Sequence, residues 1–80
     1  MKNKVPKRKA VASGSRILAT INGQSPRLLR LEQAYKTSLG DGIIGANSFL
    51  GKVMVGCAAG DQLYYEDRSE KLKITILEVK

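Results

Sequence analysis

Two segments, one near each end of the chain, alternate apolar and polar residues with a period of two. Residues 15–22 are rich in β-branched side chains and bring Ile17, Ala19 and Ile21 to one side. The segment near the C-terminus shows the pattern most clearly. Its apolar set is Leu72, Ile74 and Ile76, and its polar set is Lys71, Lys73 and Thr75. Such alternation is typical of antiparallel strands with one buried face and one face in water.

A chain of 80 residues provides one domain with one modest core. Hydrophobic residues make up 42% of it, but there is no Trp and only one Phe, so an aromatic-lined ligand pocket is not expected. Cys57 is the only cysteine, which excludes an intramolecular disulfide and favours a reducing compartment. No apolar run approaches the roughly 20 residues that span a bilayer. We therefore expect a cytoplasmic protein without a membrane partner.

The middle of the chain contains one ambiguous segment. Asn22-Gly23 is a strong hairpin signal and calls for a strand directly after it. The following residues, 25–35, begin with Ser-Pro and are rich in good helix formers, which favours a capped helix. The same residues also alternate as a strand would. Composition and spacing leave both structures open.

The segments that follow predict a loop at 37–42, a brief strand at Ile43-Ile44 and a short helix. Ser48 is suited to cap that helix and Gly56 to end it, with Leu50, Val53 and Met54 on its buried side. A strand is expected at 62–66 and a turn at 67–70. The sum is a small α+β domain: an antiparallel sheet of four or five strands with one short helix.

The net charge of +7 is concentrated at the N-terminus. Five basic residues lie within the first nine positions, and they are Lys2, Lys4, Lys7, Arg8 and Lys9. We expect residues 1–10 to form a basic disordered arm and residues 11–80 to form the folded domain. Such an arm can bind nucleic acid nonspecifically through its phosphates, or it can simply be a solvated terminus.

The order of these segments resembles the C-terminal domain of the bacterial GreA/GreB transcription elongation factors. The resemblance runs from Val11 to Val79. It is carried by Gly42-Ile-Ile-Gly-Ala-Asn-Ser-Phe-Leu-Gly-Lys-Val-Met-Val-Gly56, by Gly60-Asp-Gln-Leu63 and by Lys73-Ile-Thr-Ile-Leu-Glu-Val79. It implies an FKBP-like fold and a strand, not a helix, at Arg27–Gln33.

The resemblance also implies a partner. In that family this domain docks on a coiled coil of the largest RNA polymerase subunit, at the rim of the secondary channel. The matching residues here are Asn47, Ser48 and Phe49, with Lys52 added as an exposed cation on the same helix. Phe49 replaces the proline of the family pattern, and it fits either a partner anchor or a core position. The metal-bearing N-terminal coiled coil of the family has no counterpart, so docking is implied and transcript cleavage is not.

Catalysis finds little support in the residues. The chain has no His, and a lone Cys57 is more often a small buried hydrophobe than a nucleophile. Asp61 and Asp67 sit where Asp commonly makes turn hydrogen bonds, and the glycines do not match a phosphate-binding loop. We therefore predict no enzyme, cofactor, metal or small-molecule substrate. The alternative to polymerase docking is a small basic nucleic-acid-binding domain, in which one ring of Tyr64-Tyr65 would be exposed for stacking.

Overall fold

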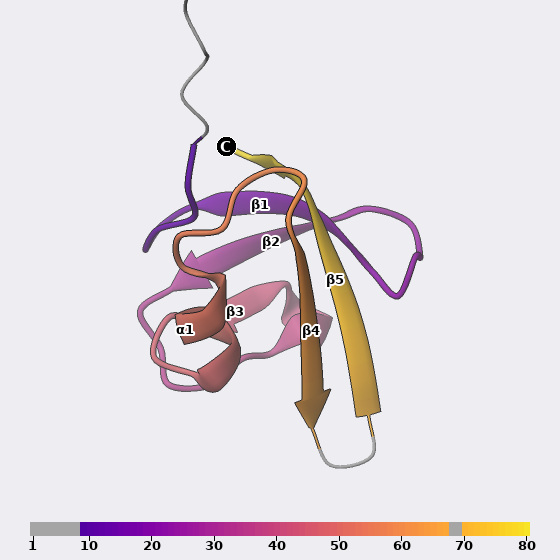
Figure 1. Ribbon diagram of the computed structural model, residues 1–80. Coiled ribbons are helices and arrows are strands. Elements are labelled where there is room, and N and C mark those ends of the chain that lie inside the picture. Colours follow the sequence, from indigo (N-terminus) through magenta and orange to yellow (C-terminus); the bar gives the residue numbers. More distant parts are fainter. Residues whose placement is uncertain (1–8, 68–69) are drawn as a thin grey trace, which may run out of the picture.

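The computed structural model describes residues 9–67 and 70–80. Within these residues a five-stranded sheet curls around one short helix (Figure 1). The elements are β1 (Arg16–Ile21), β2 (Arg27–Glu32), the 3₁₀ turn η1 (Leu39–Asp41), β3 (Ile43–Gly45), α1 (Phe49–Met54), β4 (Gln62–Asp67) and β5 (Glu70–Val79). The strand order is β3-β2-β1-β5-β4. The predicted α+β class is confirmed.

The sheet is mixed, so the prediction of a purely antiparallel sheet was wrong at one pairing. Strand β1 pairs antiparallel with β2 and β5, and β4 pairs antiparallel with β5. Strands β2 and β3 run parallel, with Leu31 beside Ile44. The connection between them passes through η1 and ends at Gly42, whose φ of 74° is left-handed. This turn sends the chain back alongside β2 in the same direction, which a direct hairpin could not do.

The segment predicted at Arg27–Gln33 forms strand β2 up to Glu32, as the family resemblance implied. Asn22 and Gly23 both have positive φ, 54° and 74°, and the N–H of Gln24 donates to the carbonyl of Ile21 at 3.1 Å. Two positive φ values in succession characterise the hairpin turn that the sequence predicted. Pairing with β1 across this turn satisfies the backbone of β2 and overrides the helix propensity of its residues.

The core is aliphatic and lies between the inner face of the sheet and α1. Its fully buried side chains include Ile17, Leu29, Ile44, Ile74 and Ile76. Near the end of β5 the register with β1 shifts between Leu18 and Ala19, so an extra residue of β5 bulges out. Because of this bulge, the next buried side chain of β5 after Ile76 is Val79, and Leu77 stays exposed.

Helix α1 confirms the predicted start and end. Ser48 is the N-cap, and Gly56, with a φ of 94°, follows the C-cap. Leu50 and Met54 are buried as predicted, but Val53 is 42% exposed, so its prediction as a core residue was wrong. At about 100° per residue, Val53 lies one turn after Phe49 on the outward side of this six-residue helix.

Several sequence predictions fall outside the described residues. Lys2, Lys4, Lys7 and Arg8 of the basic arm do, and so do Arg68 and Ser69 of the turn predicted at 67–70. Lys9, the last basic residue of the arm, is described and exposed. In residues 9–67 and 70–80, no helix is long and apolar enough to cross a bilayer.

Candidate docking site on helix α1

Helix α1 is fixed at its start by two hydroxyl groups. The Oγ of Ser48 accepts the N–H of Gly51 at 3.1 Å and donates to the carbonyl of Gly45 at 2.6 Å. The Oγ1 of Thr37 lies 2.7 Å from that Oγ and accepts the N–H of Gly45 at 3.1 Å. Because the hydrogen of Ser48 goes to Gly45, Thr37 donates to Ser48. This network ties the helix start to β3 and to the loop that follows β2.

The helix also approaches the sheet closely, backbone against backbone. A Cβ on Gly51 would overlap the carbonyl oxygen of Gly45, and a Cβ on Gly45 would overlap that of Lys36. Only glycine fits at both positions, since any side chain would have to push the helix or the loop away. The hydroxyl network and the glycine contact together give α1 one defined position on β3.

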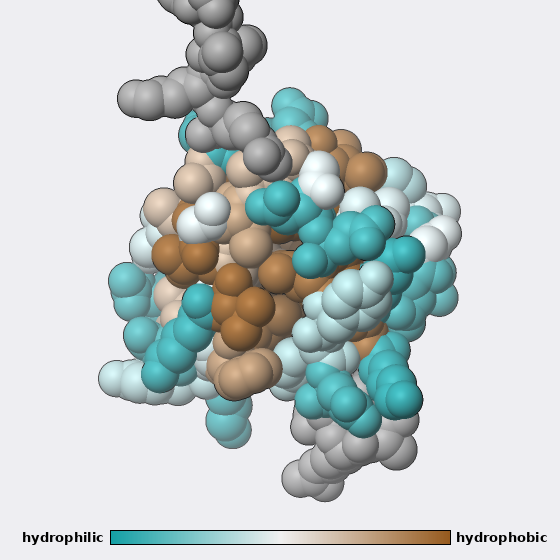
Figure 2. All heavy atoms as spheres, viewed as in Figure 1, coloured by the Kyte–Doolittle hydropathy of each residue, from teal (hydrophilic) through white to brown (hydrophobic). Residues whose placement is uncertain are grey.

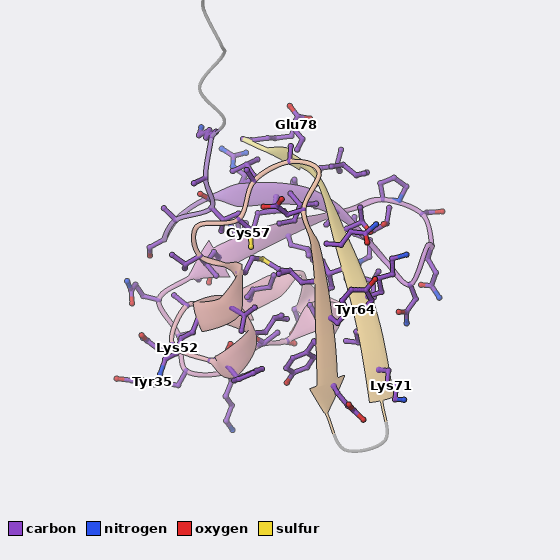
Figure 3. The ribbon with its side chains drawn as sticks, in the orientation of Figure 1. Tyr35, Lys52, Cys57, Tyr64, Lys71 and Glu78 are labelled. Atoms are coloured by element: carbon purple, nitrogen blue, oxygen red, sulfur yellow. The ribbon has the colours of Figure 1, made fainter. Side chains whose placement is uncertain are left out.

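The outward side of α1 is apolar with one cation. Phe49 is 68% exposed and Val53, four residues later, shares its side of the helix. Lys52 is also exposed, and Figure 3 shows it on the same side of the molecule as Tyr35. Figure 2 shows hydrophobic side chains gathered over α1, with hydrophilic ones around them. We call Asn47, Phe49, Lys52 and Val53 the α1 surface.

Phe49 is held in place although most of it is exposed. Its ring centroid lies 6.0 Å from that of Tyr65, with the ring planes tilted by 34°. Tyr65 is half-buried in β4 and packs against the core. This contact supports the Phe49 ring while most of the ring stays exposed. Of the two positions that the sequence allowed for Phe49, the structure has the exposed one.

Asn47 joins the α1 surface to the loop after β2. Its backbone N–H donates to the carbonyl of Ala34 at 2.9 Å, and its side-chain Nδ2 donates to Oε1 of Gln33 at 3.4 Å. Tyr35, the next residue along that loop, is 83% exposed. Sequence analysis did not select Tyr35 or Val53 as site residues. An aromatic two residues before the loop at 37–42 was the signal that could have pointed to Tyr35.

The four residues selected from the sequence therefore differ in what they can do. Asn47, Phe49 and Lys52 present side chains to solvent at one end of the molecule. Ser48 lies half-buried beneath them, and its hydroxyl is engaged within the domain. It can position Phe49 but offers little to a partner.

The residues of the nucleic-acid alternative lie elsewhere. Tyr64 is 73% exposed on the outer face of β4, directly opposite Lys73 of β5. The two residues line an open hollow of about 450 Å³ together with Asn22, Glu66 and Lys71. Figure 3 shows Tyr64 and Lys71 on the β4–β5 hairpin, away from Lys52 and Tyr35. The predicted division of Tyr64 and Tyr65 between the two faces of the sheet is confirmed.

Cys57 lies at the end of α1 in a position that suppresses its reactivity. Burial raises the pKa of its thiol, and the carboxylate of Asp61 raises it further. The thiol donates to the carbonyl of Val53 at 3.6 Å. Because the thiolate is the reactive form, this environment disfavours a nucleophile at neutral pH. Among residues 9–67 and 70–80, no cluster of three or more His, Cys, Asp or Glu side chains could hold a metal ion.

These features define a small α+β domain with a curled mixed sheet and an exposed, rigidly seated helix. Its fold matches that of the prokaryotic transcription elongation factor GreA/GreB from Nitrosomonas europaea, with a TM-score of 0.69 and 19% sequence identity. The match covers 94% of this chain and 62% of that one, so this chain spans less than two thirds of the comparison protein. No protein-family model and no curated protein match the sequence. The resemblance predicted from the sequence is confirmed at the level of the fold.

Proposed function

We propose that this domain binds bacterial RNA polymerase near its secondary channel and modulates transcription elongation in the cytoplasm without chemistry of its own. The exposed Phe49 on the α1 surface carries this proposal. Phe49 lies at the helix start that the family resemblance matches to the polymerase contact. The fold shared with a GreA/GreB elongation factor supports a role in transcription.

The α1 surface has the properties of a protein-docking site. Phe49 and Val53 form an exposed apolar pair. Because the contact with Tyr65 already restricts the Phe49 side chain, Phe49 would lose less conformational entropy on binding. Aromatic anchors of this kind often dominate interface energetics. Lys52 beside them suits an acidic rim on the partner. The surface therefore fits a helical partner that offers an apolar stripe flanked by carboxylates.

The proposed activity is occupation of a site. The described residues hold no cluster of side chains that could bind a metal ion, and burial and Asp61 raise the pKa of the Cys57 thiol. A domain that docks without delivering a metal ion would compete with longer factors that enter the same channel. Competition of this kind would change elongation by displacement alone.

The test is a binding titration of purified bacterial RNA polymerase with the intact chain, by biolayer interferometry. Phe49→Ala should weaken binding about 30-fold, since loss of an aromatic hot spot costs about 2 kcal/mol or more. Tyr64→Ala is the matched control, because Tyr64 is also an exposed aromatic but lies on the β4–β5 hairpin. It should leave the affinity unchanged.

A third variant separates docking from charge. A chain lacking residues 1–10 should bind the polymerase as the intact chain does, and binding should survive 0.5 M salt. Absence of binding, or binding that needs only residues 1–10 and disappears in salt, would rule out the docking proposal. The second outcome would favour the nucleic-acid alternative, whose phosphate contacts are strongly salt-dependent.

A further inference from the structure

The sheet has two outer strands, β3 and β4, and the outward backbone groups of β3 are hydrogen-bonded within the domain. On β3, the N–H of Ile43 donates to the carbonyl of Ser38 at 3.0 Å, and Ser38 returns a bond of 2.8 Å. The N–H of Gly45 donates to Thr37, and its carbonyl accepts the N–H of Ser48 at 2.9 Å. The backbone groups along this edge are therefore satisfied within the domain.

The other outer strand, β4, is different, and the hydrogen bonds of Lys73 reveal which of its groups point outward. The N–H and carbonyl of Lys73 bond to Asn22, each at 2.8 Å, so both face β1. Lys73 stands opposite Tyr64, and this pair therefore exchanges no ladder bonds. The backbone groups of Tyr64 must point away from β5. With a period of two, those of Gln62 and Glu66 do the same.

The outward edge of β4 is open. No backbone hydrogen bond joins 62, 64 or 66 to another segment in the part of the chain that the structure describes. Helix α1 approaches β4 from the inner face, through the Phe49–Tyr65 contact, and Gln62, Tyr64 and Glu66 remain exposed. Figure 1 shows β4 alongside β5, which is its only neighbour in the sheet order of the described residues.

Strand β4 also carries few of the devices that usually protect an edge. It pairs with β5 in an unbroken register from Gln62 to Asp67, so no bulge twists it away. It contains no Pro and no Lys, and its two charged residues, Glu66 and Asp67, lie together at its C-terminal end. Proteins normally guard a regular edge of this kind against pairing with another chain. An open, regular edge whose first four residues are uncharged, on a sheet whose other edge is closed, indicates an interaction surface.

We propose that β4 pairs antiparallel with β4 of a second copy of this chain, about a two-fold axis through Tyr64. Over residues 62–66 the sequence of the edge is complementary to itself in that register, while Asp67 at the end of β4 falls opposite Asp61 of the second copy. Gln62 stands opposite Glu66 of the second copy, where the amide can donate to the carboxylate. Leu63 stands opposite Tyr65, and the two Tyr64 rings meet at the axis. From 62 to 66 no like charges oppose each other.

The dimer that results has a continuous sheet and a limited interface. The outward N–H and carbonyl groups of residues 62, 64 and 66 supply its backbone hydrogen bonds. Five residues of edge bury less surface than a standard stable interface, so the dimer dissociates on dilution. Its formation uses a different part of the molecule from Phe49 and is independent of polymerase docking.

The experiment is a concentration series of the intact chain, followed by sedimentation velocity and by NMR amide exchange. The sedimentation coefficient should rise with concentration. In the concentrated sample, exchange should slow at the amides of Gln62, Tyr64 and Glu66. The amides of Leu63 and Tyr65, which bond to β5, should be protected at every concentration.

Three variants at one position test the mechanism. Tyr64→Pro removes the outward N–H but no ladder bond to β5, and Tyr64→Lys places two ammonium groups together at the axis. Both should abolish the concentration dependence. Tyr64→Val keeps the N–H and should retain the dimer. The Tyr64→Lys variant covers the case in which Tyr64→Pro fails to fold.

Two results would overturn the proposal. One is a wild-type chain that stays monomeric throughout the series, which would mean that the β4 edge does not pair with a second copy. The other is a dimer that survives Tyr64→Lys. Phe49→Ala should dimerise normally, so failure of docking and failure of dimerisation can be told apart.

Discussion

The backbone contact between α1 and β3 predicts that Gly51→Ala destabilises the domain. An ideal Cβ on Gly51 would overlap the carbonyl oxygen of Gly45 and lie 2.8 Å from the Cα of Ala46. Both obstacles are backbone atoms, which cannot rotate away as the end of a side chain could. The helix would have to move outward, away from the hydroxyl of Thr37 that helps to hold its start.

Two opposing effects decide the size of the change. Replacing Gly by Ala inside a helix gains about 1 kcal/mol from helix propensity. Forcing an extra methyl group into a closely packed contact costs about 1–3 kcal/mol, and more where no side chain can yield. Because the obstacles to Gly51→Ala are rigid, we expect the clash to prevail by about 2 kcal/mol. In a domain of this size that lowers Tm by roughly 10 °C.

The measurement is thermal and urea unfolding followed by circular dichroism, with Gly40→Ala as the matched control. A Cβ on Gly40 would meet nothing within 4 Å, so that variant should be as stable as the wild type or slightly more stable. If Gly51→Ala unfolds at or above the wild-type temperature, the close backbone contact does not determine the position of α1.

Three further results are expected from the same structure. Ser48→Ala removes the N-cap acceptor and should lower the free energy of unfolding by about 1 kcal/mol in urea titrations; an unchanged value would mean that the hydroxyl network is dispensable. Ile74→Ala should lower the free energy of unfolding by about 3 kcal/mol because Ile74 is fully buried, whereas Leu77→Ala at the bulge should lower it by less than about 1 kcal/mol. Equal losses for the two variants would contradict the bulge. Cys57 should react slowly with iodoacetamide at neutral pH, because burial and Asp61 raise its thiol pKa, and Asp61→Asn should speed the reaction. If the folded chain is labelled as fast as the chain unfolded in urea, this environment does not protect the thiol.

The strands were predictable where a local period was sufficient. The alternation in residues 15–22 and 71–76 placed β1 and most of β5 correctly, and Asn22-Gly23 identified the turn. The β2 segment carried conflicting local signals. Its outcome depends on pairing with β1, which period and propensity do not contain.

The parallel pairing of β3 was not predictable by the same means. Three residues hold too little periodicity to show direction, and the reversal depends on the path of the whole connection through η1. The prediction that Val53 is buried was wrong because its spacing from Leu50 fits the apolar stripe of a helix. The six-residue helix α1 buries a narrower side, which includes Leu50 and Met54 but not Val53.

The candidate site was predictable in part. Ser48 could be identified as a cap from its residue type, and the exposure of Lys52 followed from helical geometry. The exposure of Phe49 could not be predicted, since a short aromatic-poor domain could equally have used it in the core. Tyr35 joins the same end of the molecule only because Asn47 bonds to the loop after β2, a contact between segments that no local pattern reports.

The central pairing of β1 with β5 has a consequence for the synthesis of the chain. The ladder reaches from Ile17 beside Val79 to Ile21 beside Ile74, and Asn22 extends it to Lys73. During synthesis β1 must therefore wait for β5 before the middle of the sheet can form. Until then β1 and β2 form a hairpin with an apolar face and no core. This domain therefore completes its folding only after β5 has been translated, and a chain stalled before β5 is exposed to proteolysis and aggregation.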